Sequence, residues 1–260
     1  MLPRATDSIL PAPEPAALSA QHANQRTEQA TLPPEQAALP LLAFYGGSFN
    51  PVHYGHLNTA RYLAQLLPAS RIIFLPNSSP PHKDTAKLSY DARRAMLAAA
   101  IKECLSECDV HGKSRYDICD LESDAHTRHY TIDTLTKLKA LYPQHQLAFI
   151  MGWDSLITLD QWKQGLKLHQ LAQLIVLKRP GLSDQSIPPA VQTSMAQNPE
   201  HYRIVANPEF EVSSSAIRAQ IAHHSHQQTR YEQGAEPYPE LSALLPLSVR
   251  TLIAQHGYYR

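Results

Sequence analysis

The stretch FYGGSFNPVHYGHL, residues 44–57, predicts how the chain begins to fold. It starts inside a continuous apolar run, residues 41–45, which indicates a strand buried on both faces. Two glycines stop this run, and apolar positions at helical spacing follow in HLNTARYLAQLL, residues 56–67. A second apolar run, RIIFLP at 71–76, completes a βαβ unit, so we expect its two strands to be parallel.

The same alternation continues along the chain. We expect helices at 90–105 and 131–143, strands at 116–122, 147–152 and 202–207, and a short helix that runs into a strand over 168–181. This pattern predicts an α/β fold, a Rossmann-like open, mostly parallel sheet with helices on both faces. Residues 180–200 and 223–240 contain several prolines or consecutive polar residues and are predicted to be loops.

Composition limits the classes of function. The 260 residues are 43% hydrophobic, enough for a sizeable core, and 23 basic residues balance 23 acidic ones. No net field therefore favours nucleic acid or an anionic membrane, and no stretch approaches the length of a membrane span. Three cysteines, an odd number, argue against a disulfide framework, so we expect a cytoplasmic protein.

The N-terminal part differs from the rest of the chain. Residues 1–40 are rich in Pro, Ala and Gln and poor in aromatic residues, which predicts a disordered extension, with a transit peptide or a partner-binding tail as alternatives. The catalytic or binding domain is expected over residues 41–260. The histidines at 223, 224 and 226 are interpreted as part of a solvated loop rather than a metal site, because no carboxylate or cysteine completes a ligand set.

The loop after the first strand has the features of a phosphate site. In open α/β sheets ligands bind where parallel strands end and helices begin. Gly46, Gly47 and Ser48 lie at such a point, where backbone N–H groups and the helix dipole suit phosphate oxygens. His53 and His56 are three residues apart, so both imidazoles can project to the same side and donate to a phosphate. The alternatives are that His53 caps the helix and that His56 is a core histidine with its hydrogen bonds satisfied.

These residues resemble the HxGH signature of the nucleotidyltransferase superfamily that is distantly related to class I aminoacyl-tRNA synthetases. The resemblance implies that His53 and His56 contact the phosphates of a nucleoside triphosphate. A second segment, VSSSAIR at 212–218, predicts a serine-capped helix whose first turn carries Arg218. It is similar to the ISSTxIR motif of nicotinate and nicotinamide mononucleotide adenylyltransferases, with Val212 for Ile and Ser215 for Thr.

The resemblance covers residues 41–260 and implies a role for further residues. Catalytic roles fall to His53, His56 and Arg218. ATP binding falls to Gly46, Gly47, Ser48, Phe49, Gly152, Asp154, Ser213, Ser214 and Ser215. Binding of nicotinate mononucleotide falls to Asn50, Asn77, His82, Lys83, Thr131, Trp162 and Arg179, with Asn50 standing where many members have Asp.

The implied reaction is adenylyl transfer from ATP, with Mg²⁺, to nicotinate mononucleotide. Nicotinamide mononucleotide or another phosphate acceptor such as phosphopantetheine is an alternative, as are cytidylyl transfer and a non-catalytic nucleotide-binding role. The expected partners are thus small nucleotides, with neither nucleic acid nor membrane. No KMSKS-like lysine loop, which a class I synthetase would need, is present in the sequence.

Overall fold

The computed structural model describes residues 39–67, 70–78, 88–108, 112–124, 126–178, 187–206, 212–227 and 236–260. Almost all of the predicted N-terminal extension, and with it the alternatives for residues 1–40, lies outside these ranges. Residues Ala38–Arg260 form one compact unit, to which the following description applies.

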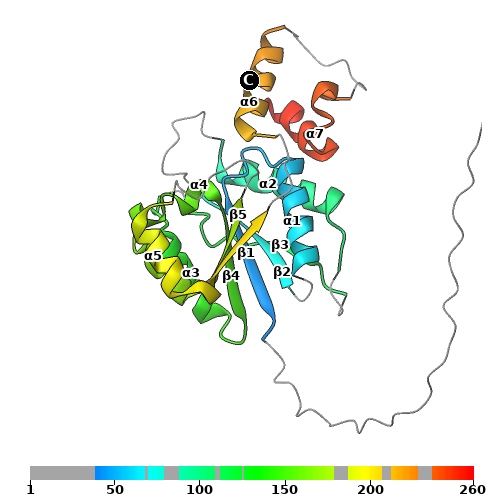
Figure 1. Ribbon diagram of the computed structural model, residues 1–260. Helices are drawn as coiled ribbons and strands as arrows, with labels where there is room; N and C mark the ends of the chain where they lie inside the picture. Colours follow the sequence, from blue (N-terminus) through cyan, green and yellow to red (C-terminus); the bar gives the residue numbers. More distant parts are fainter. Residues whose placement is uncertain are drawn as a thin grey trace, which may run out of the picture. The chain divides into compact units, whose positions relative to one another are not determined.

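A six-stranded sheet forms the centre of this unit (Figure 1). Its strands are β1 (Leu41–Gly47), β2 (Ser70–Pro76), β3 (Tyr116–Ile118), β4 (Gln146–Gly152), β5 (Gln173–Lys178) and β6 (Tyr202–Ala206). They lie in the order β3-β2-β1-β4-β5-β6, and every pairing between them is parallel. The prediction of a parallel Rossmann-like sheet is confirmed.

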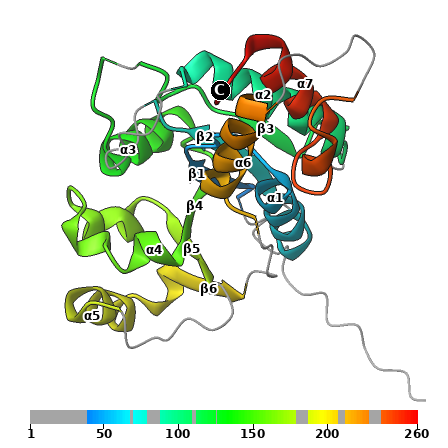
Figure 2. The same ribbon diagram turned by 90° about the horizontal axis from the view of Figure 1, so that it is seen from above.

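Helices cover both faces of the sheet, as expected (Figure 2). One face packs against α1 (Tyr54–Leu66) and α2 (Tyr90–Cys104). The apolar cluster on that face also includes residues of α6 (Ser214–Gln227) and α7 (Leu247–His256), which lie beyond the upper ends of the strands in Figure 1. The other packs against α3 (Thr131–Leu141), α4 (Trp153–Leu156), α5 (Pro189–Gln197) and the 3-10 turns Leu159–Gln161 and Gly165–Gln170. Two further 3-10 turns are Pro199–His201 and Pro239–Leu241.

Alternation along β1 divides the core. Ala43 and Tyr45 belong to the cluster under α1 and α2, whereas Leu42 and Phe44 belong to the cluster under α3. Because successive side chains of a strand point to opposite faces, a strand between two helical layers must be apolar at nearly every position. This requirement explains the continuous apolar run over residues 41–45.

The two loop predictions were wrong in part. In the range 180–200, Pro189 occupies the opening turn of α5, where its missing N–H costs nothing. The prolines there mark the start of a helix. In the second, α6 extends to Gln227 and includes the three histidine positions, and a 3-10 turn occupies Pro239–Leu241. The predicted strand at 116–122 is shorter, Tyr116–Ile118.

Cys104, Cys108 and Cys119 are all free in the structure. Among the helices of the described ranges, none combines the length and the apolar character that a membrane span requires.

Candidate active site

The site lies at the topological switch point of the sheet. Strand β1 pairs with β2 on one side and with β4 on the other, so the connections after β1 and β4 run to opposite edges. In such sheets the loops at the carboxyl ends of these two strands leave a crevice between them. The loop that carries the histidine pair follows β1, and Gly152 ends β4.

The histidine pair has a defined geometry. His53 is the N-cap residue of α1, and the rings of His53 and His56 are stacked with their centroids 3.8 Å apart. The two imidazoles thus project to the same side, as predicted, although His53 also occupies the capping position that was its alternative. The backbone N–H of His53 donates to Nδ1 of His56 at 3.3 Å. In a neutral ring this bond leaves the proton on Nε2, where it can be donated to a ligand.

Phe49 packs against the ring of His56 and so supports the histidine pair. Its φ of 45° lies in the left-handed region, and its ring is fully buried. The ring packs edge-on against Tyr45, Phe74 and His56, with centroids 5.7, 5.5 and 5.1 Å away. The role of Phe49 in the structure is therefore to hold the loop and the His56 ring, while its contact with ATP stays a prediction.

Packing also explains the two glycines. A Cβ at Gly47 would lie 2.9 Å from the Phe49 ring, and one at Gly46 would lie 3.1 Å from the Phe149 ring. A side chain at Gly47 would force the Phe49 ring to move, and one at Gly46 would need a smaller shift of the Phe149 ring, so the packing of aromatic rings favours glycine at both positions. Their predicted approach to a ligand is not required to explain the residue type.

The second motif contacts the first directly. Arg218 donates through Nη1 to the backbone oxygen of Asn50 at 2.7 Å, and Ser214 donates through Oγ to the oxygen of Pro51 at 3.0 Å. Ser213 caps α6 by accepting the N–H of Ala216, as predicted for a serine at this place. Ser215 accepts a bond from Nη2 of Arg218 at 3.1 Å. The start of α6, with the cationic side chain of Arg218, is thus bound to the loop that carries His53 and His56.

Arg93 is a site residue that the sequence reasoning missed. Its side chain is 2% exposed and donates to the backbone oxygens of Ser48 (2.6 Å) and Asn77 (2.7 Å). It also donates to the oxygens of Ser78 and Leu88. Burial lowers the pKa of this guanidinium, while nearby Tyr259 and Tyr90 act in the opposite direction. Arg93 therefore ties together the loops that follow β1 and β2.

The end of β4 leaves open space. A Cβ built at Gly152 would meet no atom within 4 Å, and Asp154 is exposed in the first turn of α4. Next to them, the ring of Trp153 is buried and Lys178 Nζ lies 4.7 Å from its centroid. Gly152 is thus placed so that a ligand could lie against its backbone.

The start of α3, which carries Thr131, is joined to the segment around Trp162 through neighbouring residues. Tyr130 is the N-cap residue of α3, and Lys163, adjacent to Trp162, places Nζ 4.6 Å from the Tyr130 ring centroid. Lys163 also pairs with Asp133 at 2.8 Å. The Trp162 ring is partly buried and its Nε1 donates to Thr158, so the ring packs on the core at one side.

A buried carboxylate steadies the start of α3. Glu122 accepts a hydrogen bond from Thr134 Oγ1 at 2.7 Å, and burial raises the pKa of Glu122 above its usual value.

Asn77, at the end of β2, has a buried Oδ1 with no hydrogen-bond partner among the described residues. A buried acceptor of this kind costs free energy unless something pairs with it, which fits the prediction that Asn77 binds a ligand.

Three predicted site residues, His82, Lys83 and Arg179, lie outside the described residues, and their roles stay predictions. Within the described part of the chain, no group of three His, Cys, Asp or Glu side chains forms a cluster that could hold a metal ion.

The sheet order and the histidine loop define a nucleotidyltransferase, and the family model described as cytidylyltransferase-like matches residues 44–220. A protein of Sodalis glossinidius (strain morsitans), named "Probable nicotinate-nucleotide adenylyltransferase", is 36% identical over 233 residues, which cover 85% of this chain and 97% of that protein. A protein of the same name from Shewanella sp. (strain ANA-3) is 32% identical over 232 residues, or 84% and 99% of the two chains. The chain therefore belongs to the nicotinate-nucleotide adenylyltransferase family.

A solved structure supports the fold. The Plasmodium falciparum nicotinic acid mononucleotide adenylyltransferase, solved in complex with NaAD, superposes with a TM-score of 0.63 at 20% identity, covering 84% of this chain and 97% of the other.

Proposed function

We propose that this protein transfers the adenylyl group of Mg-ATP to nicotinate mononucleotide. An oxygen of the acceptor's 5′-phosphate attacks the α-phosphorus of ATP, the bond from that phosphorus to the bridging oxygen breaks, and pyrophosphate leaves. The products are nicotinate adenine dinucleotide and pyrophosphate. The observation that carries the proposal is the contact of Arg218 with Asn50, which brings both family motifs to one place beside His53 and His56.

The chemistry fits the groups present. A phosphate monoester is already an anionic nucleophile near neutral pH, so positioning and neutralisation of charge are the main tasks of the protein. His53, His56, Arg218 and the backbone N–H groups around Ser48 bind the phosphates of ATP. Mg²⁺ would enter with ATP and would neutralise part of the charge on its phosphates, so the protein need not supply a cage of carboxylates.

Nicotinate mononucleotide, the acceptor, binds with its nicotinate ring at the start of α3 in this proposal. The carboxylate of nicotinate can accept N–H bonds from the first turn of a helix, where the dipole also favours negative charge. Tyr130 provides no side-chain cap there, and Arg128 and Lys163 both lie against its ring. An amide in place of the carboxylate would gain less from these donors and cations, which favours the acid form of the mononucleotide. The phosphate and ribose of the mononucleotide are bound by His82, Lys83, Asn77 and Arg179. Its pyridine ring stacks on Trp162.

The direct test measures pyrophosphate release from Mg-ATP with nicotinate mononucleotide and nicotinamide mononucleotide offered separately. We expect turnover on the acid form, with kcat/KM at least about tenfold higher than on the amide form. Detection of the dinucleotide product in equal amount to pyrophosphate excludes simple ATP hydrolysis. No turnover on either acceptor would refute the proposal, and equal turnover on both would refute its choice of the acid.

Replacing Gly152 with alanine is expected to raise the KM for Mg-ATP by about tenfold or more while the thermal midpoint stays unchanged. The added methyl group meets nothing in the free protein but overlaps a nucleotide that lies against this backbone. Gly165→Ala is the matched control, because its Cβ would lie 1.8 Å from the oxygen of Leu159. This control should lower the thermal midpoint instead. Unchanged ATP kinetics in Gly152→Ala would place the adenosine elsewhere.

A further inference from the structure

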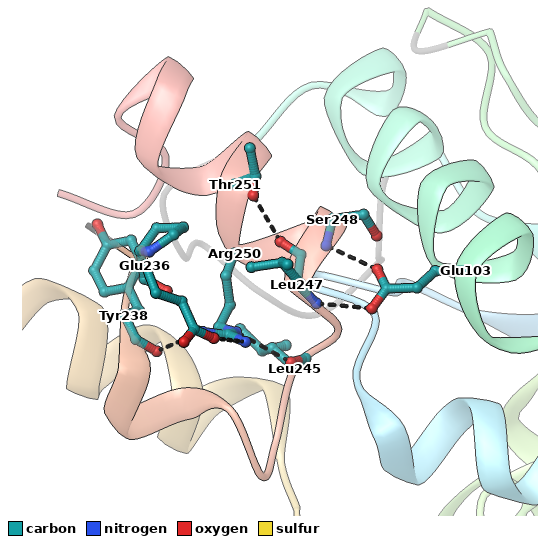
Figure 3. A network of polar contacts seen from close by, with 9 residues as sticks. Glu103, Glu236, Tyr238, Leu245, Leu247, Ser248, Arg250 and Thr251 are labelled. Carbon is teal, nitrogen blue, oxygen red and sulfur yellow. Dashed lines mark hydrogen bonds and ion pairs between the residues drawn. The ribbon is translucent and has the colours of Figure 1, made fainter. Parts of the chain in front are cut away.

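The C-terminal helix is fixed to the domain by a polar network (Figure 3). Pro246, the N-cap residue of α7, has no side chain that could cap the helix. Glu103 from α2 does so instead, accepting the backbone N–H groups of Leu247 at 3.0 Å and Ser248 at 2.8 Å. A carboxylate at a helix start satisfies free donors and complements the dipole. Helix α7 is thereby attached to α2, the helix that also carries Arg93.

A buried arginine holds the same helix from its other side. Arg250 is 4% exposed and pairs with Glu236 at 2.6 Å. It also donates to the backbone oxygens of Pro237 at 2.9 Å and of Leu245 and Tyr238 at longer distances. The position of α7, and of the residues that follow it, is therefore closely defined.

The chain turns back after α7 and brings its penultimate residue to the active site. Gly257 ends the helix with a φ of 65°, and Tyr259 has a φ of 66°. A left-handed conformation is unfavourable for a tyrosine, so other contacts must hold it there. The hydroxyl of Tyr259 donates to Oδ1 of Asn50 at 2.6 Å, across 209 positions of sequence.

Asn50 is thus held at two points. Tyr259 binds its side-chain oxygen, and Arg218 binds its backbone oxygen at 2.7 Å. The first bond fixes the orientation of the amide and directs its Nδ2 hydrogens away from Tyr259. Asn50 precedes His53 by three residues in the same loop, so a change in its position is transmitted to the histidine pair.

The surroundings of Tyr259 keep its hydroxyl in the donor form. Burial raises the pKa of Tyr259, whereas Arg218 and Arg93 act to lower it. The two guanidiniums that act on the ring belong to the two contacts that shape the loop, since Arg93 binds the oxygen of Ser48 and Arg218 that of Asn50. Tyr259 therefore lies close enough to both arginines that hold the loop from Ser48 to His53 for their charges to act on its hydroxyl.

We propose that Tyr259 is a positioning residue of the active site: its hydroxyl fixes the Asn50 side chain and, through this residue, the loop that carries His53 and His56. The inference rests on the proposed function for its kinetic readout. The proposal gives a role in the reaction to Tyr259, a residue that lies outside both family motifs.

The test compares Tyr259→Phe with Tyr258→Phe in the full chain. Tyr258 is the matched control because it is adjacent, stacks on His256, and its hydroxyl makes no hydrogen bond with the described part of the chain. We expect Tyr259→Phe to lower kcat/KM for Mg-ATP by about three- to tenfold, the effect of one hydrogen bond. Tyr258→Phe should behave as the wild type. Equal kinetics of the two variants would overturn the proposal.

A double-mutant cycle separates positioning from a general structural role. If Tyr259 acts through Asn50, then Tyr259→Phe should have no further effect on kcat/KM in an Asn50→Ala background. Asn50→Asp, which keeps a side-chain oxygen for the tyrosine, should remain sensitive to Tyr259→Phe. An undiminished effect of Tyr259→Phe in the Asn50→Ala background would show that Tyr259 does not act through Asn50.

Failure of the proposed function can be distinguished from failure of this inference. If the wild type shows no turnover, the proposed function fails, and the same variants are then compared by calorimetry with Mg-ATP alone. Weaker binding by Tyr259→Phe than by Tyr258→Phe supports the positioning role whatever the acceptor is. Equal binding, or no binding by any variant, overturns it.

Discussion

Replacing His56 with alanine is expected to reduce kcat by about 100- to 1000-fold. The Nδ1 atom of His56 accepts the His53 backbone N–H, so a neutral ring presents Nε2–H to the nucleotide. A donor that is held in place before the substrate binds stabilises charge that develops on the phosphates without reorganisation. Removing it should therefore affect the chemical step more strongly than the KM for ATP.

The measurement is steady-state pyrophosphate release at saturating Mg-ATP and acceptor, with the thermal midpoint as a check on folding. His201→Ala is a suitable control, since His201 lies beside the amino end of β6, opposite the carboxyl ends that form the site. His56→Gln, which can retain an N–H donor, should recover part of the lost rate. A kcat for His56→Ala within about threefold of the wild type would remove His56 from the catalytic mechanism.

The order of the elements could be predicted because the signals are local. Apolar runs bounded by glycine or proline, and helical spacing between them, are enough to define a parallel sheet, and a parallel sheet places its site at the strand ends. The histidine pair was found for the same reason, since His53, Gly55 and His56 lie in one turn at such an end. The prolines at 188 and 189 predict a loop where a helix begins, because in sequence a proline that opens a helix resembles one that prevents it.

Contacts between distant segments could not be predicted in this way. Nothing in the residues alone pairs Arg218 with Asn50, and only the resemblance to a known motif brought the two segments together. Tyr259 follows the last helix and has no periodic pattern that indicates where its hydroxyl points. Its role depends on the packing of α7 against α2, which is a property of the folded chain.

The position of Arg93 in the sequence of α2 does indicate that its side chain is buried. It lies four residues before Leu97 and seven before Ala100, both of which are fully buried, so it belongs to the apolar stripe of α2. An arginine at such a position must find several acceptors within the fold, because a buried charge without partners is costly. The loops at the ends of β1 and β2 provide these acceptors.

Replacing Arg93 with lysine is therefore expected to lower both the stability of the fold and the rate of the reaction. One guanidinium now serves the backbone oxygens of Ser48, Asn77 and Ser78, and an ammonium group cannot reach all of them from a single position. Each partly buried oxygen that loses its donor costs about 1–3 kcal/mol, so we expect a loss of about 2–4 kcal/mol in the free energy of unfolding. Because two loops of the site lose their common anchor, kcat/KM should fall by about 10- to 100-fold.

Arg94→Lys is the matched control for this experiment. Arg94 is adjacent on the same helix, but its side chain is 42% exposed and pairs with Asp120 at 2.7 Å rather than with Ser48, Asn77 or Ser78. An exposed pair of this kind contributes at most about 1 kcal/mol, so this variant should keep nearly full activity. Denaturant unfolding and initial rates should be measured on both variants. If Arg93→Lys matches Arg94→Lys in both properties, the buried guanidinium does not anchor the site, and the two loops must be held by their remaining contacts, among them the bond from the Asn77 N–H to the oxygen of Gly47.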